Sequence, residues 1–203
     1  MNDAVRRFHA LRGAPTPRLR ALRRELSREL RDAPAQDVLS LARRLHAAGH
    51  RFPAAELILD HPAALASIGA RELEEFGRGM AGWGDVDVFA CLLAGPAWRD
   101  GQVADRVIRA WARRADRWWR RAALVATVAV SRAGDSRRTL AVCRLLVADR
   151  DDMVVKAMSW ALRELAKRDA PAVRRFLADH AVAPRVLREV TNKLRTGLKN
   201  PRR

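Results

Sequence analysis

The sequence predicts an all-α protein built from stacked pairs of helices. Of its 203 residues 49% are hydrophobic and none is tyrosine, so helix formers are abundant and strand-forming runs are scarce. Apolar residues recur at helical spacing along most of the chain. Pairs of such segments recur at intervals of about 35 to 40 residues, which is typical of HEAT-like arrays. We therefore expect a HEAT-like αα-repeat solenoid, an alpha-alpha superhelix with a basic concave face.

The first half of the chain contains four expected helices. Pro15-Thr16-Pro17 predicts a helix start with Thr16 as the N-cap, and leucines follow at helical spacing as far as Leu30. Pro62 should break the chain between two later segments. The other three helices are expected over residues 34–49, 53–60 and 70–79.

The second half continues the same rhythm of apolar segments and short breaks. One of these breaks is expected at Gly95-Pro96 and another at Gly134. The organisation is then a basic lead-in over 1–14, one repeat domain over 15–197, and a disordered basic tail over 198–203 that adds non-specific DNA affinity. Helices are expected over residues 83–93, 101–114, 117–132, 135–147, 151–167, 171–180 and 184–194.

The charge balance indicates an acidic partner. Forty basic and twenty-three acidic residues give a net charge of +17, for which nucleic acid is the simplest partner, although RNA, the ribosome or an anionic membrane would also satisfy the charge. The longest uncharged runs are about half as long as a membrane span requires, and no signal-peptide pattern is present. We expect a soluble cytoplasmic, nucleoid-associated protein whose Cys91 and Cys143 are buried and reduced.

Tryptophan recurs beside charged residues at helical spacing. Trp83 and Asp87 are four residues apart, which places an indole and a carboxylate on one face of a helix. Tryptophans at helical spacing are more often core residues, and this is the reading we expect for Trp98 and Trp111. Two further pairs put an indole three residues before a cation: Trp118 with Arg121, and Trp160 with Arg163. Together the pairs predict a place where a cation is handled on nucleic acid.

Three segments in order resemble one known family. They are Trp83-Gly84-Asp85-Val86-Asp87, Trp118-Trp119-Arg120-Arg121-Ala122-Ala123, and Lys156-Ala157-Met158-Ser159-Trp160-Ala161-Leu162-Arg163-Glu164. The resemblance, which spans residues 13–199, is to the AlkD-like HEAT-repeat DNA glycosylases of DNA alkylation repair. It implies base excision of cationic N3- or N7-alkylated purines from duplex DNA, without deep base flipping, by a monofunctional, monomeric enzyme that uses no metal and no cofactor.

The resemblance also implies roles for individual residues. Asp87 matches the catalytic aspartate, and Trp83 and Trp160 match the indoles that bracket the lesion nucleotide. Arg121 and Arg163 match arginines that hold the DNA backbone. Possible additional DNA contacts are Trp119, Arg120 and Lys156, with Trp119 exposed on the groove and Trp118 serving as packing.

Physical chemistry supports these roles. An alkylated purine is already a cationic leaving group, so cleavage of its N-glycosidic bond needs little acid catalysis. Positive charge develops on the sugar, and a carboxylate beside it stabilises the transition state and orients water. Indoles attract the cationic base, and arginines on the flanking phosphates fix its position.

Other readings remain open at the level of sequence. Asp87 is also compatible with a surface carboxylate paired with an arginine. A non-catalytic HEAT-repeat protein that recognises distorted or branched duplex DNA is one alternative, and a scaffold for RNA or an acidic protein is another. Two departures from the family bear on activity: Gly84 replaces a usual acidic residue, and the helix expected before Pro15 is short or missing.

Overall fold

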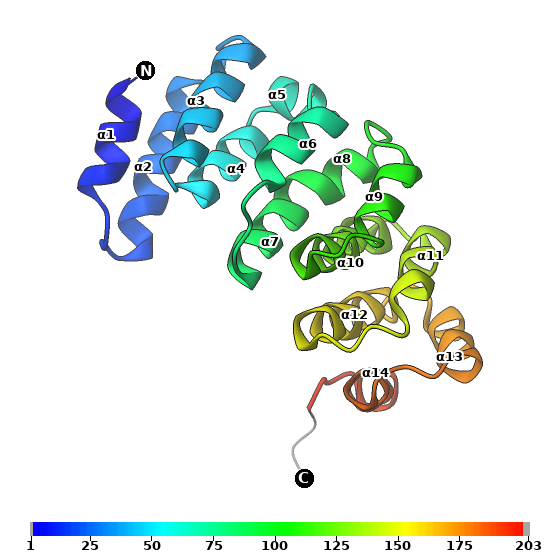
Figure 1. Cartoon of the computed structure of the whole chain (residues 1–203). Helices are drawn as coiled ribbons and strands as arrows, with labels where there is room; N and C mark the ends of the chain where they lie inside the picture. The colour runs from blue at the N-terminus through cyan, green and yellow to red at the C-terminus, as the bar shows by residue number, and fades with distance from the viewer. Residues whose placement is uncertain (1, 201–203) are drawn as a thin grey trace. The chain divides into compact units, whose positions relative to one another are not determined.

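The computed structural model describes residues 2–200, and within this range every regular element is a helix. The chain divides into two compact units, Met1–Arg78 and Gly79–Arg203, which are described separately (Figure 1). The expectation of an all-α repeat protein is therefore confirmed. The basic concave face and the single domain over 15–197 stay predictions. No helix in residues 2–200 has both the length and the apolar character needed to cross a membrane.

The first unit is built from six helices in the described residues. Residues of the expected lead-in form a nine-residue helix, and Phe8 is fully buried. Pro15, not Thr16, occupies the N-cap of the next helix, and no side chain caps it. The break at Pro62 is confirmed, because one helix ends at Asp60 and the next begins at Pro62. The helices are α1 (Asn2–Ala10), α2 (Thr16–Glu29), α3 (Ala35–Ala47), α4 (Arg51–Asp60), α5 (Pro62–Ala66) and α6 (Ala70–Gly77).

The second unit carries all the predicted site residues. Its first helical stretch is followed by six helices in the described residues. Five of them have nearly the bounds that the sequence predicts. The elements are α7 (Trp83–Phe89), η1 (Ala90–Ala94), α8 (Gly95–Arg99), α9 (Asp105–Trp111), α10 (Arg117–Arg132), α11 (Ser136–Leu146), α12 (Asp152–Leu165), α13 (Ala170–Asp179) and α14 (Pro184–Thr196). The segment 101–114 is the clearest departure, because only its middle, Asp105–Trp111, is helical.

The expected break at Gly95-Pro96 is wrong. The helix that begins at Trp83 passes through the π-helical turn η1 and continues as α8 to Arg99. A proline ring inside an α-helix meets the carbonyl four residues earlier, and the wider hydrogen-bonding pattern of the π turn accommodates it. Gly95 is needed for a different reason: a Cβ atom there would lie 2.9 Å from the Ala129 Cβ, so its absence lets α8 pack closely on α10.

Helices α10, α12 and α14 lie parallel and side by side (Figure 1). Ion pairs join corresponding ends: Arg117 to Asp151 at 3.4 Å and Arg185 to Asp152 at 3.0 Å. Together with α7 these helices begin about 32 to 35 residues apart, at or just below the lower limit of the expected interval. This period brings residues one repeat apart in sequence into contact on adjacent helices.

The core of the second unit is rich in tryptophan. Trp98 and Trp111 are 1% and 0% exposed, which confirms that they are core residues. The Trp98 Nε1 donates to the Asp105 carboxylate at 2.9 Å, so its one polar atom is satisfied. Trp111 packs against Trp119 with ring centroids 5.0 Å apart. This core fixes the relative positions of α7, α9 and α10.

Candidate functional site

The centre of the site is an ion pair between α7 and α10. The Arg121 Nε donates to one carboxylate oxygen of Asp87 at 3.0 Å, and its Nη2 donates to the other at 2.9 Å. This two-point geometry fixes the plane of the carboxylate as well as its position. The Asp87 side chain is 21% exposed whereas that of Arg121 is 7% exposed. The pair therefore presents its acidic side to solvent and keeps its basic side inside.

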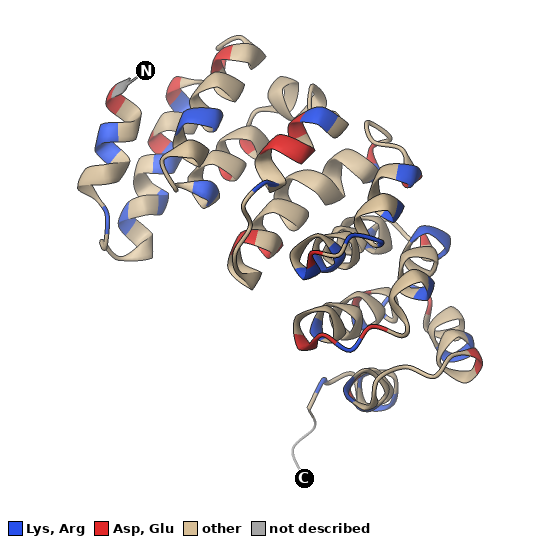
Figure 2. Ribbon diagram, viewed as in Figure 1, with Lys and Arg blue, Asp and Glu red and all other residues tan. Residues whose placement is uncertain are grey.

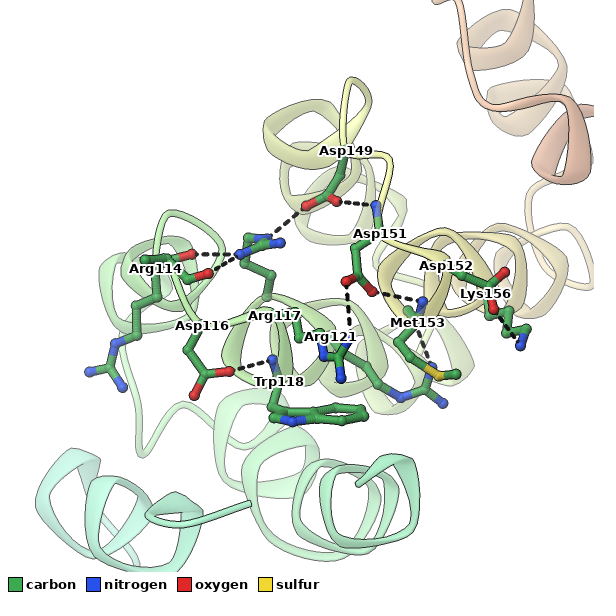
Figure 3. A network of polar contacts seen from close by, with 12 residues as sticks. Arg114, Asp116, Arg117, Trp118, Arg121, Asp149, Asp151, Asp152, Met153 and Lys156 are labelled. Atoms are coloured by element: carbon green, nitrogen blue, oxygen red, sulfur yellow. Dashed lines mark hydrogen bonds and ion pairs between the residues drawn. The ribbon is translucent and has the colours of Figure 1, made fainter. Parts of the chain in front are cut away.

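Arg121 also reaches the third helix of the site. Its Nη1 donates to the backbone carbonyl of Met153 at 2.7 Å, in the first turn of α12 (Figure 3). One guanidinium thus ties α7, α10 and α12 together at a single point. All three of its nitrogens donate inside the protein. The predicted contact of Arg121 with DNA phosphate stays a prediction, and the geometry gives this residue the additional task of orienting Asp87.

Trp83 lies one helical turn before Asp87 and points into open space. It is the first residue of α7 and is 62% exposed, the largest value among the exposed large hydrophobic residues. No aromatic or cationic side chain in the described residues contacts its ring. A Cβ atom added at Gly82 or Gly84, on either side of Trp83, would meet no atom within 4 Å, so the surroundings of these residues are open. The indole is therefore available to a ligand next to the exposed part of Asp87.

Helix α12 carries the other two predicted residues, Trp160 and Arg163. Trp160 is half-buried, and within residues 2–200 no ring contact involves it. The Arg163 Nε donates to the Ser159 hydroxyl at 3.3 Å. No acceptor among the described residues takes a hydrogen bond from its two terminal NH2 groups. Arg163 therefore differs from Arg121, because its bidentate end is free to bind a phosphate.

The three additional contacts predicted from the sequence fare differently. Trp119 is only 8% exposed and its ring lies under the Arg114 guanidinium at 4.1 Å, so the expectation of an exposed indole is wrong. The helical register explains this, because Trp119 falls on the face of α10 that packs on the aromatic core. Arg120 donates to Asp149 at 2.7 Å and to two backbone carbonyls, and Lys156 pairs with Asp152 at 2.6 Å. Contacts of Arg120 and Lys156 with DNA stay predictions.

Carboxylates cap α10 and α12, two of the helices that carry the site (Figure 3). Asp116 accepts from the Trp118 backbone N–H at 2.8 Å and Asp151 from the Met153 N–H at 2.9 Å, so each completes a helix N-terminus. Acidic and basic side chains consequently alternate at these ends (Figure 2). An aspartate directly before an apolar-periodic segment indicates an N-cap, so the sequence contained this pattern. The Lys156 ammonium lowers the pKa of Asp152 through its hydrogen bond.

Cys91 lies one turn beyond Asp87, in the π-helical turn. Burial, with the charge of Asp87 as a further cause, raises the pKa of its thiol to about 11. Burial raises the pKa of Cys143 to about 12, and both cysteines are free. Cys143 is buried as expected, whereas Cys91 is only partly so. A thiol with so high a pKa is protonated at neutral pH and is a poor nucleophile.

Comparisons with known proteins place the fold. The structure is similar to a solved structure described as a predicted DNA alkylation repair enzyme from Enterococcus faecalis, with a TM-score of 0.75 and 18% sequence identity. The similarity covers 91% of this chain and 88% of that one. No curated protein matches the sequence. The family model of the DNA alkylation repair enzyme matches residues 2–194. The chain therefore belongs to the DNA alkylation repair enzyme family.

Proposed function

We propose that this protein is a monofunctional DNA glycosylase that hydrolyses the N-glycosidic bond of cationic N3- or N7-alkylated purines in duplex DNA. The observation that carries the proposal is the Asp87 carboxylate, held at both oxygens by Arg121 and still partly open to solvent. Each carboxylate oxygen has a second acceptor position beyond the one that Arg121 uses. These positions face outward and are available to a water molecule or to a positively charged sugar.

The chemistry requires stabilisation of positive charge more than proton donation. The alkylated base leaves as a neutral purine, and charge builds up on the deoxyribose as the bond breaks. A carboxylate in a fixed orientation stabilises this charge without reorganisation and directs a water molecule to the anomeric carbon. Water forms the new C–O bond at the anomeric carbon as the N-glycosidic bond breaks, and it gives up one proton to solvent. The products are the neutral free base, an abasic site to be processed by downstream repair, and a proton.

Trp83, Trp160 and Arg163 position the substrate in this proposal. The exposed indole of Trp83 offers its face to the cationic nucleotide, with a contribution of about 0.5–2 kcal/mol per contact depending on desolvation. The free end of Arg163 binds a backbone phosphate bidentately. An open site of this kind recognises the damaged base without a deep pocket for a flipped base. In this proposal the protein acts as a cytoplasmic, nucleoid-associated monomer.

The test is release of free base from duplex DNA that contains 7-methylguanine or 3-methyladenine. We expect release by the wild-type protein and a reduction of at least about a hundredfold in Asp87→Asn. Asp85→Asn is the matched control, since it removes the same charge two residues away on the same helix. Equal release by wild type and Asp87→Asn would remove Asp87 from its role.

A non-catalytic DNA-binding protein is the second candidate, and one observation favours it. Because Arg121 neutralises Asp87, the carboxylate repels DNA less than an unpaired one would, so its presence is compatible with simple binding. Tight binding to damaged or branched duplex without any base release by the wild-type protein would establish this alternative.

A further inference from the structure

A buried carboxylate on α14 is hydrogen-bonded to α12. Glu189 on α14 is only 5% exposed, and its Oε2 accepts from the Ser159 hydroxyl at 2.6 Å. Ser159 is 0% exposed and lies four residues, about one turn, before Arg163 on α12. Neither Ser159 nor Glu189 has a part in the chemistry proposed above. Carboxylates are rarely buried without a charge partner, so the pair calls for an explanation.

The hydrogen bonds run in one direction. A serine inside a helix usually donates to the carbonyl four residues earlier, but Ser159 donates to Glu189 on the neighbouring helix. Because a hydroxyl carries one hydrogen, its oxygen can then only accept, and it accepts from the Arg163 Nε at 3.3 Å. The chain is therefore Arg163 to Ser159 to Glu189, ending on a negative charge.

A second cation approaches Glu189 from the C-terminal segment. Gly197, with φ at +74°, turns the chain after α14. The Lys199 Nζ then lies 3.5 Å from the Glu189 Oε2, and the Asn192 side chain donates to the Lys199 carbonyl at 3.2 Å. This part of the expected disordered tail is thus folded back on α14, while residues 201–203 lie outside the described residues. Glu189 is compensated by Lys199 directly and by Arg163 through the serine.

We propose that Glu189, acting through Ser159, is a positioning residue that holds the Arg163 guanidinium ready for a DNA phosphate. Fixing Nε leaves the two terminal NH2 groups, which have no acceptor among the described residues, as a preformed bidentate donor. An unrestrained arginine loses much rotamer freedom when it binds, and an anchored one has lost it already. The hydroxyl relay keeps the carboxylate from pairing with the guanidinium directly, which would occupy the phosphate-binding end.

The inference rests on the proposed role of Arg163 on DNA, and a double-mutant cycle tests it. Affinity for a short fluorescein-labelled undamaged duplex is measured by anisotropy for Ser159→Ala, Arg163→Ala and the double variant. We expect each single variant to bind about tenfold more weakly, and the double variant to bind no more weakly than Arg163→Ala. Glu189→Gln, which keeps an acceptor but removes the charge, should show part of the Ser159→Ala loss.

Ser131→Ala is the matched control. Ser131 is also 0% exposed, and its hydroxyl bonds Thr139 on α11 at 2.8 Å, so it takes no part in the hydrogen bonds of Arg163, Ser159 and Glu189. It should lower the melting temperature as Ser159→Ala does, without changing DNA affinity. Additive losses in the Ser159–Arg163 cycle would overturn the proposal, as would unchanged DNA affinity in Arg163→Ala.

Base release by the same variants gives a second readout. In an active enzyme, Ser159→Ala should lower kcat/KM mainly through KM, because the bound phosphate is contacted in both ground and transition states. If the wild-type protein releases no base, the proposed glycosylase fails, and the binding cycle still decides the role of Glu189. The two failures are therefore distinguishable.

Discussion

Arg121 donates from Nε and Nη2 to the two carboxylate oxygens of Asp87, 34 positions earlier in the chain, at 3.0 and 2.9 Å. The same guanidinium donates to the Met153 carbonyl of the next repeat at 2.7 Å. Stacked helix pairs bring such residues together because each repeat contacts its neighbours. The acidic residue of the site is thereby locked to the scaffold on which the rest of the site is built.

Replacing Arg121 should destabilise the protein. Arg121→Ala leaves Asp87 without its partner and the Met153 carbonyl without a donor, which should lower the free energy of unfolding by about 3 kcal/mol. Arg121→Lys should recover little of this, because an ammonium cannot make the two parallel bonds. Urea unfolding measures both. Arg163→Lys is the control and should change stability by less than about 0.5 kcal/mol. An Arg121→Ala variant that is as stable as the wild type would show that the ion pair with Asp87 does not stabilise the protein.

Replacing an exposed and a buried tryptophan should have different effects on base release and on stability. Trp83→Ala removes an indole that is 62% exposed, so stability should change by less than about 0.5 kcal/mol while base release falls. Trp111→Ala removes an indole that is 0% exposed, and it should lower the free energy of unfolding by about 3–5 kcal/mol. Thermal unfolding and the base-release assay, run on both variants, provide the comparison. Loss of stability in Trp83→Ala would mean that its ring packs against the protein.

Two glycines of the same helical stretch should respond oppositely to alanine. At Gly95 a Cβ would lie 2.9 Å from Ala129 Cβ and from the Ala90 carbonyl oxygen, so Gly95→Ala should destabilise by about 1–3 kcal/mol. At Gly84 an added Cβ would meet no atom within 4 Å. Gly84→Ala should therefore stabilise the protein by about 0.5 kcal/mol, because alanine has the higher helix propensity. Chemical unfolding measures both signs. Equal effects would contradict the close approach of α8 to α10.

Salt dependence should distinguish the arginines. Arg163→Ala removes a free phosphate donor, so the slope of log affinity for DNA against log salt should fall by about one. Arg99→Ala is the control, because the Arg99 guanidinium already donates to both carboxylate oxygens of Asp100 and Arg99 is not among the predicted DNA contacts. Its slope should stay close to that of the wild type. The measurement is duplex binding across a salt titration, and an unchanged slope in Arg163→Ala would argue against a phosphate contact.

Stability should fall at alkaline pH because of the thiols. Burial keeps the Cys143 thiol protonated up to a pKa of about 12, above its ordinary value of 9.0. The unfolded chain therefore releases this proton first, and stability that is fully present below about pH 9 is lost as pH rises toward 12. For one thiol the loss is about 1.4 kcal/mol per pH unit. Urea unfolding of wild type and Cys143→Ala between pH 8.5 and 10.5 should show a shallower decline in the variant, and identical declines would exclude this cause.

The helices and the residue types of the site follow from local patterns in the amino-acid sequence. Apolar periodicity, prolines and glycines are local features, so they predicted most helices, the break at Pro62, and the burial of Trp98 and Trp111. The spacing of Trp83 and Asp87 placed both on α7, one turn apart. These properties depend only on neighbours within a few positions along the chain.

The directions of the side chains between helices depend instead on packing between segments that are distant in the sequence. Arg120 and Arg121 are adjacent and differ by about 100° around the helix, and only contacts with α7 and α12 bring Arg121 to Asp87. Packing on the aromatic core buried Trp119, and the π turn carried the helix past Pro96. The link from Arg163 through Ser159 to Glu189 spans two repeats. No local pattern encodes such contacts, because burial and hydrogen bonding depend on residues about thirty positions away.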